Sequence, residues 1–250
     1  MCEAAWLIIP TYNEVDNLRP LVERALNVLA DASPGGHRVL IVDDASPDGT
    51  GRLADTLAAH MPAVEVLHRT TRVGLGPAYL AGFTVALNGG AGYVLQMDAD
   101  FSHDPADLGR LLNRAKQGAD LVLGSRYVPD GGVTDWTAGR RLISRAGCWY
   151  ARAILGVPIR DLTGGFKCFR RASLEKIDFP TVQSQGYAFQ VEMTYRVLRR
   201  GLSVVEVPIV FRERREGESK MSAGIVLEAA WRVPHLRLNP ESRHVDDHPR

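Results

Sequence analysis

The first half of the chain alternates short, continuously apolar runs with longer segments in which apolar residues recur every three or four positions. Continuous apolar runs of this length predict strands buried on both faces, and the longer period predicts helices that cover them. The predicted strands are residues 6–9, 39–42, 64–67, 93–97 and 121–123, and the predicted helices are residues 18–29, 50–60, 79–87 and 106–117. This alternation is typical of an α/β fold with a parallel sheet.

The second half of the chain is less regular. Its pattern predicts a basic helix over residues 140–155, a strand over 163–169, a helix over 187–200, a strand over 204–211, a charged loop over 212–220 and a helix over 221–231. We therefore expect one Rossmann-like domain over residues 1–234, with a mostly parallel sheet flanked by helices. Residues 235–250 are polar, and we expect a mobile tail there.

One apolar stretch is long enough to cross a bilayer, because residues 73–97 contain no charged side chain. The Asn88-Gly89-Gly90 break favours a helix followed by a buried strand instead. The N-terminal apolar run carries Glu3 and stops at Pro10, which argues against a secretory signal. Any membrane role is therefore expected to be peripheral.

Charge and cysteine content narrow the class of protein further. The chain has 30 Lys and Arg against 29 Asp and Glu, a net charge of +1, which gives no support for a nucleic-acid partner. Cys2, Cys148 and Cys168 show no CxxC spacing, so the sequence predicts neither a disulfide framework nor a zinc site. A reducing, cytoplasmic location is the simplest interpretation.

Polar clusters follow the first, second and fourth predicted strands. In parallel α/β sheets, ligands bind outside the carboxyl ends of the strands, so these clusters are candidate binding residues. The clusters are residues 10–14, 43–50 and 98–105.

Asp98 and Asp100 have two interpretations. They could be turn and cap residues, since Asp is common in turns. Alternate residues of an extended segment also point the same way, so both carboxylates could face one ion. Oxygen donors of this kind suit Mg²⁺ or Mn²⁺ shared with substrate phosphates.

The pair Asp43-Asp44 is equally ambiguous. Loop aspartates often cap the next helix, and Asp48 near Thr50 is placed for that role. The alternative is that these carboxylates accept hydrogen bonds from a ribose or a base.

Several arginines lie near the same predicted edge. Arg126 follows the fifth strand, and Arg140, Arg141 and Arg145 cluster on the next segment. A charge run is usually a solvated face, but arginine is also the preferred partner of phosphate oxygens. The glycine-rich segment 72–79 matches neither a dinucleotide-binding GxGxxG nor a Walker A motif, and no Ser–His–Asp set is evident.

Taken together, these motifs resemble the family 2 glycosyltransferases of the GT-A fold, and within them the polyprenyl-phosphate (dolichol-phosphate) mannose synthases. The match runs from Leu7 to about Lys220. It rests on PTYNE at 10–14, VDDASPDGT at 42–50, GLGPAY at 74–79, MDADFSH at 97–103, GSRY at 124–127, DLTGGFK at 161–167, GYAFQ at 186–190, and the ending from Phe211 through Arg214 to Lys220.

The resemblance implies a GT-A domain and a set of donor-binding residues. Asp98 and Asp100 would bind Mg²⁺ or Mn²⁺ at the diphosphate, with Ala99 against the ribose. Ser102 stands where some relatives have Gln, so its role as a metal ligand is in doubt. The remaining residues implied for GDP-mannose are Pro10, Tyr12, Glu14, Val42, Asp44, Arg126, Arg214 and Lys220.

The resemblance also implies an acceptor and a mechanism. Arg126 and Arg140 would bind the phosphate of a polyprenyl monophosphate, and Asp100, Arg126, Arg140 and Lys220 would be the catalytic residues. An anionic phosphate oxygen needs no general base, and in-line attack would invert the anomeric centre to give a β-linked product. Glu192 could be proposed as a base, but a structural ion pair is the favoured interpretation.

Two alternatives remain open from the sequence. One is a UDP-sugar-dependent glucosyl or N-acetylhexosaminyl transferase, and the other is a non-catalytic nucleotide-sugar-binding protein. The prenyl tail needs an apolar surface, for which the segments 133–136 and 221–231 are candidates, although the latter could equally pack on the core. We expect peripheral contact with the cytoplasmic face of a membrane, and a membrane-anchoring partner protein is compatible with it.

Overall fold

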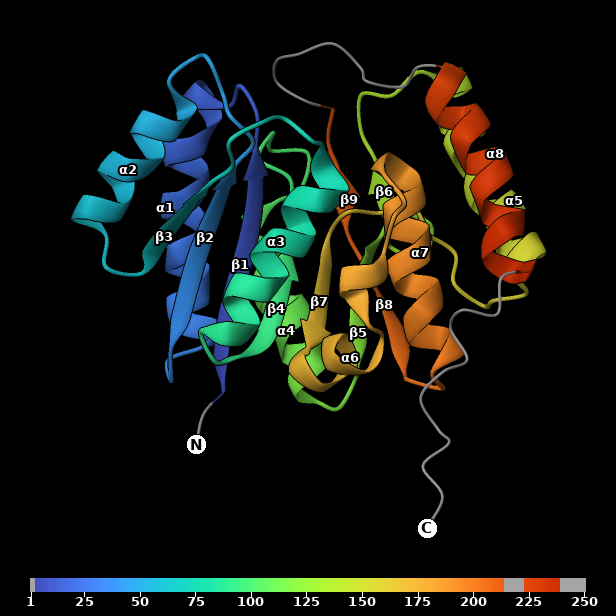
Figure 1. Ribbon diagram of the computed structural model, residues 1–250. Coiled ribbons are helices and arrows are strands. Elements are labelled where there is room, and N and C mark those ends of the chain that lie inside the picture. Colours follow the sequence, from blue (N-terminus) through green and yellow to red (C-terminus); the bar gives the residue numbers. More distant parts are fainter. Residues whose placement is uncertain (1–2, 214–222, 239–250) are drawn as a thin grey trace.

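A seven-stranded sheet in the order β3-β2-β1-β4-β7-β5-β8 forms the centre of the computed structural model (Figure 1). The structure describes residues 3–213 and 223–238, with the side chains of 223–230 excepted. All neighbouring strands are parallel except β7, which runs antiparallel to both β4 and β5. The strands are β1 (Ala4–Thr11), β2 (His37–Asp43), β3 (Val64–His68), β4 (Ala91–Gln96), β5 (Leu121–Ser125), β7 (Lys167–Arg170) and β8 (Val204–Pro208).

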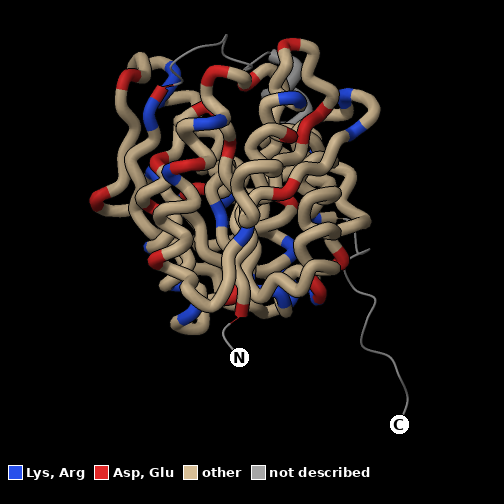
Figure 2. Tube along the Cα trace, turned by 90° about the vertical axis from the view of Figure 1, so that its left-hand side faces the viewer, with Lys and Arg blue, Asp and Glu red and all other residues tan. Residues whose placement is uncertain are grey.

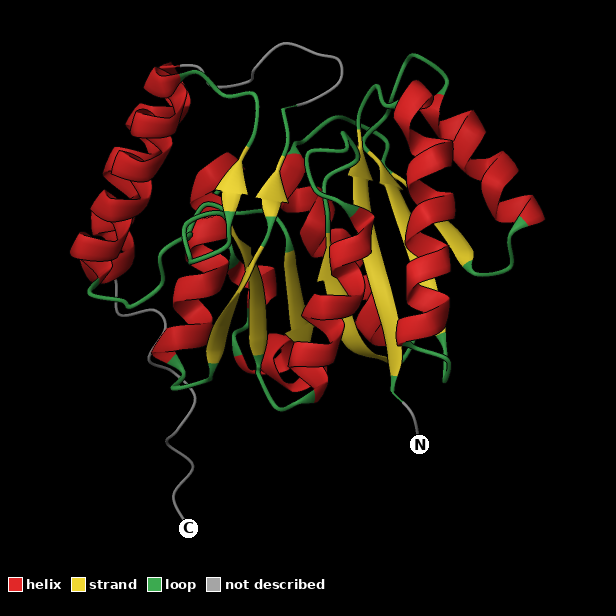
Figure 3. Ribbon diagram, turned by 180° about the vertical axis from the view of Figure 1, so that it is seen from behind, coloured by secondary structure: helices red, strands yellow, loops and turns green. Residues whose placement is uncertain are grey.

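Helices cover both faces of the sheet, as the alternating pattern predicts. Figure 1 shows α3, α6 and α7 in front of the sheet, and Figure 3 shows it from behind. The helices are α1 (Val15–Ala32), α2 (Thr50–His60), α3 (Leu75–Asn88), α4 (Leu108–Lys116), α5 (Ala138–Leu155), α6 (Arg171–Lys176), α7 (Gly186–Arg199) and α8 (Ala223–Leu238), with short 3₁₀ turns η1 (Pro105–Asp107) and η2 (Phe179–Thr181).

The alternation of side chains along each strand divides the core into two layers. In β1, Trp6 and Ile8 pack with the layer under α3 and α7, whereas Leu7 and Ile9 pack with the layer under α1 and α4. Both sets are buried because a central parallel strand has helices on either side. The continuous apolar runs in the sequence have this origin.

The predicted strand over residues 204–211 is divided in the structure. Ile209 separates β8 from β9 (Val210–Phe211), which pairs with β6 (Gly132–Val133) in a second, two-stranded sheet. The Ile209 N–H donates to the Ser125 carbonyl, and its own carbonyl accepts from the Gly132 N–H. One residue thus leaves the large sheet and enters the small one. The predicted strand at 163–169 is likewise shorter, because only its end belongs to β7.

The last helix extends beyond its predicted end at residue 231. Helix α8 continues to Leu238, so the first four residues of the expected tail are helical. Leu236 packs against the core, and the Arg237 guanidinium donates to the Ile154 carbonyl of α5. Residues 239–250 lie outside the described part of the chain.

The uncharged stretch 73–97 forms α3 and β4, with Gly89 and Gly90 between them, as its glycines predict. None of the helices in the described residues has the length and hydropathy needed to cross a membrane.

Gly82 lets α3 lie directly on β1 and β2. A Cβ at this position would stand 2.4 Å from Ile8 Cγ2 and 3.2 Å from Val42 Cγ2, both of them buried.

We expect Gly82→Ala to lower the free energy of unfolding by about 1–3 kcal/mol, because the helix must move off the sheet. Urea unfolding measures this. The matched control is Gly147→Ala in α5, where the added methyl group meets no described atom within 4 Å outside the nearby turns of its own helix. Alanine there should stabilise slightly, by roughly 0.5–1 kcal/mol. Equal effects of the two substitutions would contradict the packing argument.

Lys167 is a buried lysine at the start of β7. Burial lowers the pKa of its ammonium group to about 7, although the charge of Asp161 opposes the shift. Its Nζ donates to the Gln190 carbonyl at 2.7 Å, a hydrogen bond that a neutral amine also makes.

The low pKa of Lys167 predicts how stability depends on pH. Between pH 7 and about 10, the unfolded chain keeps a proton that the folded chain has lost, so the free energy of unfolding rises with pH, by at most about 1.4 kcal/mol per pH unit. We expect Lys167→Met to remove this rise. Urea titrations of both proteins from pH 7 to pH 9.5 measure the two slopes, and identical slopes would show that Lys167 keeps its proton in the folded state.

Candidate functional site

Strained turns mark the carboxyl edge of the sheet. Asn13, Ala45 and Phe101 adopt left-handed φ angles of 59°, 60° and 58°, and they follow β1, β2 and β4. Non-glycine residues rarely adopt this conformation, and such strain concentrates at functional sites. The three turns belong to the three polar clusters found in the sequence, so the backbone independently marks the same edge.

The two candidate metal-binding carboxylates follow β4 at this edge. Asp98 Oδ1 accepts a hydrogen bond from the Tyr79 hydroxyl at 2.9 Å. Burial raises the pKa of Tyr79 well above its usual value, and the charge of Asp98 adds to the shift, so the phenol keeps its proton. Asp100 Oδ1 accepts from both the N–H and the hydroxyl of Ser102. Ser102 thus positions Asp100, and direct binding of a metal by Ser102 stays a prediction.

These residues fit a divalent cation that is shared with a ligand. Among residues 3–213 and 231–238, no group of three or more His, Cys, Asp and Glu side chains could hold a metal ion. Asp98 and Asp100 supply two hard oxygen donors held in place by Tyr79 and Ser102. Mg²⁺ typically takes one or two carboxylates and completes its coordination with phosphate oxygens and water. The pair therefore suits Mg²⁺ or Mn²⁺ bound together with a diphosphate.

The residues implied for the nucleoside gather at the ends of β1 and β2. Pro10 pairs with Val42 across the two strands, and Tyr12 is the first residue after β1. The Arg72 guanidinium lies 3.9 Å from the centre of the Tyr12 ring. Glu14 accepts a hydrogen bond from the Asn17 side chain at 2.9 Å. The strand register thus brings this set together, one strand away from Asp98.

Asp44 is engaged by the loop that precedes α3. Its carboxylate accepts from Arg69 Nη1 at 2.8 Å, from the Val73 N–H at 3.1 Å and from the Gly74 N–H at 2.8 Å. A nucleoside contact would have to share these oxygens, so the donor-binding role of Asp44 stays a prediction. Asp48 accepts from the Thr50 N–H, the first amide of α2, but the N-cap residue of this helix is Gly49, so Asp48 binds the helix start from one position further out.

Ala99 lies between the two candidate metal ligands but faces the interior. Its exposed fraction is 3 %, and it packs in the layer under α1 and α4. The ribose contact implied by the resemblance stays a prediction.

Arg126 forms a buried ion pair with Asp161. Its Nε and Nη2 donate to the two Asp161 oxygens at 2.7 and 2.6 Å, and its exposed fraction is 6 %. Although burial disfavours the charge, the Asp161 carboxylate raises the pKa of Arg126 above its ordinary value. This fork is held by the protein, so a phosphate would have to approach another part of the guanidinium.

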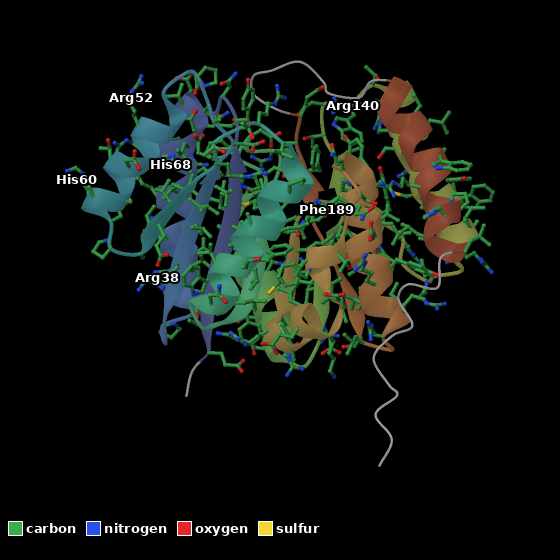
Figure 4. All side chains as sticks on the ribbon, in the orientation of Figure 1. Arg38, Arg52, His60, His68, Arg140 and Phe189 are labelled. Atoms are coloured by element: carbon green, nitrogen blue, oxygen red, sulfur yellow. The ribbon has the colours of Figure 1, made fainter. Side chains whose placement is uncertain are left out.

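Arg140 meets Arg126 at the ring of Trp136. The Arg140 and Arg126 guanidinium groups lie 4.4 and 5.7 Å from the ring centre. Arg140 also pairs with Glu213 at 2.5 Å, and Figure 4 shows it at the top of the molecule, the edge where the strands end. Trp136 Nε1 and Arg140 Nε are buried and have no hydrogen-bond partner among the described residues. We call Arg126, Trp136 and Arg140 the Arg–Trp cluster.

Phe211 joins the Arg–Trp cluster to the turn that carries Asp98 and Asp100, which we call the carboxylate turn. Its ring centre lies 5.3 Å from that of Trp136 and 5.2 Å from that of His103, the residue after Ser102. Burial lowers the pKa of His103, while the charges of Asp98 and Asp100 oppose this shift. The next residue, Arg212, donates its N–H to the Ser102 carbonyl. The segment after β9 therefore begins beside the candidate metal ligands. Arg214 and Lys220, which the sequence also predicts at the site, lie outside the described residues.

Glu192 has the ion pair that the sequence favours. Its carboxylate lies 2.6 Å from Arg196 Nη2 and also accepts from the Ser184 hydroxyl. The Glu192 side chain is buried within α7 and its neighbours. This arrangement is that of a structural ion pair.

The sequence interpretation missed Tyr79 and Arg69 as partners of Asp98 and Asp44. Each lies 19 to 25 residues from its partner along the chain, and a single sequence carries no signal for such pairs. The nearest available signal was the glycine-rich segment before α3, in which Tyr79 lies.

Known proteins give an independent view of the chain. The family described as Glycosyl transferase family 2 matches residues 6–178. An undecaprenyl-phosphate mannosyltransferase of Micrococcus luteus is 53 % identical over 92 % of this chain and 93 % of its own length. A polyprenol monophosphomannose synthase of Mycolicibacterium smegmatis is 50 % identical over 91 % of this chain and 84 % of its own length.

Solved structures agree on the fold. Glucosyl-3-phosphoglycerate synthase of Mycobacterium tuberculosis superposes with a TM-score of 0.67 at 16 % identity, covering 92 % of this chain and 80 % of that one. Mannosyl-3-phosphoglycerate synthase of Rubrobacter xylanophilus gives 0.67 at 20 % identity, covering 99 % and 77 %. At such identities the likeness concerns the fold alone, a single GT-A-like domain. With the family match and the two relatives, it leads to one conclusion: the chain belongs to glycosyltransferase family 2 and is a glycosyltransferase.

Proposed function

We propose that the protein transfers mannose from GDP-mannose to a polyprenyl monophosphate, with inversion, to give polyprenyl-phosphate β-mannose. The names of the two relatives, an undecaprenyl-phosphate mannosyltransferase and a polyprenol monophosphomannose synthase, support the lipid phosphate and the mannose. GDP as the nucleotide rests on the resemblance of the sequence motifs.

The observation that carries the acceptor is the pair of donors in the Arg–Trp cluster that lack a hydrogen-bond partner among the described residues. Buried N–H groups are nearly always hydrogen-bonded, so Trp136 Nε1 and Arg140 Nε point to a ligand that supplies acceptor oxygens. Two guanidinium groups at the same ring favour an anion. A phosphate monoester has both the oxygens and the charge.

The donor diphosphate would bind at Asp98 and Asp100. A divalent cation bound there would supply charge stabilisation at the leaving nucleotide. Neighbours of the same fold were solved with Mn²⁺ or Mg²⁺ and UDP, which supports a metal of this kind. The role that we assign to Arg214 and Lys220, contact with the donor phosphates, rests on the sequence motif alone.

The chain's own residues explain why a general base is unnecessary. The attacking oxygen belongs to a phosphate that is already anionic, and the neighbouring groups are arginines that orient it. Glu192, the carboxylate considered as a base, is held by Arg196 and Ser184. Direct attack from the face opposite the leaving nucleotide inverts the anomeric centre.

Transfer of label from GDP-mannose into the organic phase, with added polyprenyl phosphate, tests the proposed function. We expect a lipid-linked product with the wild-type protein and a loss of at least about a hundredfold with Asp100→Ala, because the charge on the leaving diphosphate is no longer stabilised. The control is Asp55→Ala in α2, which removes an exposed carboxylate.

Two results would contradict the proposal. One is release of free mannose or a soluble glycan without lipid product, which would exclude the acceptor. The other, seen by calorimetry with and without Mn²⁺, is binding of UDP in preference to GDP, which would exclude the donor.

The paired helices α5 and α8 offer the surface that we propose for membrane contact. Trp149 and Trp231 are 71 % and 75 % exposed, and Leu142 and Leu238 are exposed to a similar degree. Helix α5 carries four arginines and no acidic residue, whereas Figure 2 shows basic and acidic positions interspersed on the side turned toward the viewer. Exposed tryptophans with cations fit the interface of an anionic bilayer. Peripheral contact with the cytoplasmic face, alone or with an anchoring protein, follows from this proposal.

Cosedimentation with vesicles tests this surface. We expect binding to phosphatidylglycerol-containing vesicles, and a fall of about fivefold for Arg141→Ala, since each cation near an anionic surface contributes about 1 kcal/mol. Trp149→Ser should weaken binding through lost apolar contact. Arg52→Ala in α2, on the far side of the molecule (Figure 4), is the matched control. Equal binding by all four proteins would place the contact elsewhere.

A further inference from the structure

Two buried glutamines lie under the carboxylate turn and belong to no role described so far. Gln96 ends β4 and Gln190 lies in the second turn of α7, with exposed fractions of 0 % and 2 %. Gln96 Nε2 donates to Gln190 Oε1 at 2.7 Å. Buried side-chain amides of this kind hold a fixed orientation because their donors and acceptors are not interchangeable.

The Gly165 carbonyl fixes the orientation of both amides. It accepts a hydrogen bond from Gln96 at 2.9 Å, so the Gln96 atom facing it must be the nitrogen. The same nitrogen faces Gln190, so the Gln190 atom facing it must be the oxygen. Gln190 Nε2 is thereby turned away from Gln96, and it has no hydrogen-bond partner among the described residues.

Gln190 Nε2 lies near Asp98, and Gly165 adjoins both side chains. A Cβ at Gly165 would stand 3.5 Å from Gln190 Nε2 and 3.3 Å from Asp98 Oδ2. The φ angle of Gly165 is not among the positive ones, so its backbone does not require glycine. A side chain here would be in tight contact with the Asp98 carboxylate, so glycine lets an amide donor and a carboxylate lie close to one backbone position.

The chemistry of these two side chains suits a hydroxyl group. A hydroxyl can accept from Gln190 Nε2 and donate to a carboxylate, so it is compatible with both side chains. A phosphate would bring its charge against Asp98, and the cationic donors that phosphates prefer are in the Arg–Trp cluster. A sugar carried on a diphosphate at Asp98 would present hydroxyls at this place.

The donor is held rigidly in position. The Gln190 carbonyl accepts from Lys167 Nζ at 2.7 Å and from the Thr194 hydroxyl at 3.0 Å. With its side chain fixed by Gln96 as well, Gln190 cannot swing away without breaking several bonds. Such preorganisation is what a specificity-determining contact requires.

We propose that Gln190 Nε2 donates a hydrogen bond to one hydroxyl of the hexose being transferred, at a place where Gly165 presents no side chain. The inference rests on the proposed function, because it needs a sugar nucleotide at Asp98. It assigns to Gln190 a part in choosing the sugar.

Calorimetry with GDP-mannose and with GDP, each with Mg²⁺, tests the contact without any lipid acceptor. Gln190→Met should raise the Kd of GDP-mannose by about tenfold, the effect of one lost hydrogen bond, and change the Kd of GDP by less than about twofold. Gln190→Glu, which keeps the acceptor for Gln96, is the second variant in case the first fails to fold. Gln117→Met at the exposed end of α4 is the matched control and should alter neither Kd.

Donor analogues that lack one hydroxyl identify the partner. For one analogue, wild type and Gln190→Met should have equal kcat/KM, because the contact is already absent. Equal weakening of GDP and GDP-mannose, or the same loss with every analogue, would overturn the inference and make Gln190 structural. If the wild type binds only UDP-sugars, the proposed donor fails, and the same comparison with UDP-glucose and UDP still decides the role of Gln190.

Discussion

The buried ion pair between Arg126 and Asp161 is the interaction on which the architecture of the site depends. It ties the end of β5 to the loop that leads into β7, and Arg126 also donates to the Thr163 hydroxyl in that loop. Asp161 is in turn held by Glu206 of β8, which accepts its backbone N–H. Removing either partner would leave an uncompensated charge in the interior, a defect far more costly than the pair itself is stabilising. The pair thereby holds Arg126, one member of the Arg–Trp cluster, against the loop that leads to Gly165.

Much of this arrangement could be predicted from the sequence, because the apolar spacing of strands and of helices is a local signal. The rule that parallel strands end at one edge then places the polar clusters together. The strands 39–42 and 64–67 and the helix 50–60 follow from the spacing of apolar residues, and the three polar clusters fall on one edge because parallel strands end together. The antiparallel direction of β7 could not be predicted, because its apolar residues are the same kind that a buried parallel strand contains. The change of sheet at Ile209 was equally hidden, because it depends on hydrogen bonds to Ser125 and Gly132, more than 70 residues away. The pairing of Arg126 with Asp161 needed the same long-range information.

Several residues expected to meet a ligand are occupied by the protein itself. Asp44 organises the loop before α3, Arg126 neutralises Asp161, and Ser102 positions Asp100. Among the described residues, donors without partners lie on Arg140, which the sequence already assigned to the acceptor phosphate, and on Trp136 and Gln190, to which it assigned no phosphate or sugar contact. A sequence motif thus combines residues that would touch the ligand with residues that hold those in place, and only geometry separates the two kinds.

The small sheet formed by β6 and β9 has a consequence for variation among related chains. β6 leads into the Trp136 loop, and β9 leads into the segment that contains Arg214. Because two short strands share their hydrogen bonds, an insertion that shifts one strand shifts the start of the other. The loop that we assign to the lipid phosphate and the segment that we assign to the nucleotide phosphates therefore start from one shared pair of strands, and a change in either strand moves the start of both.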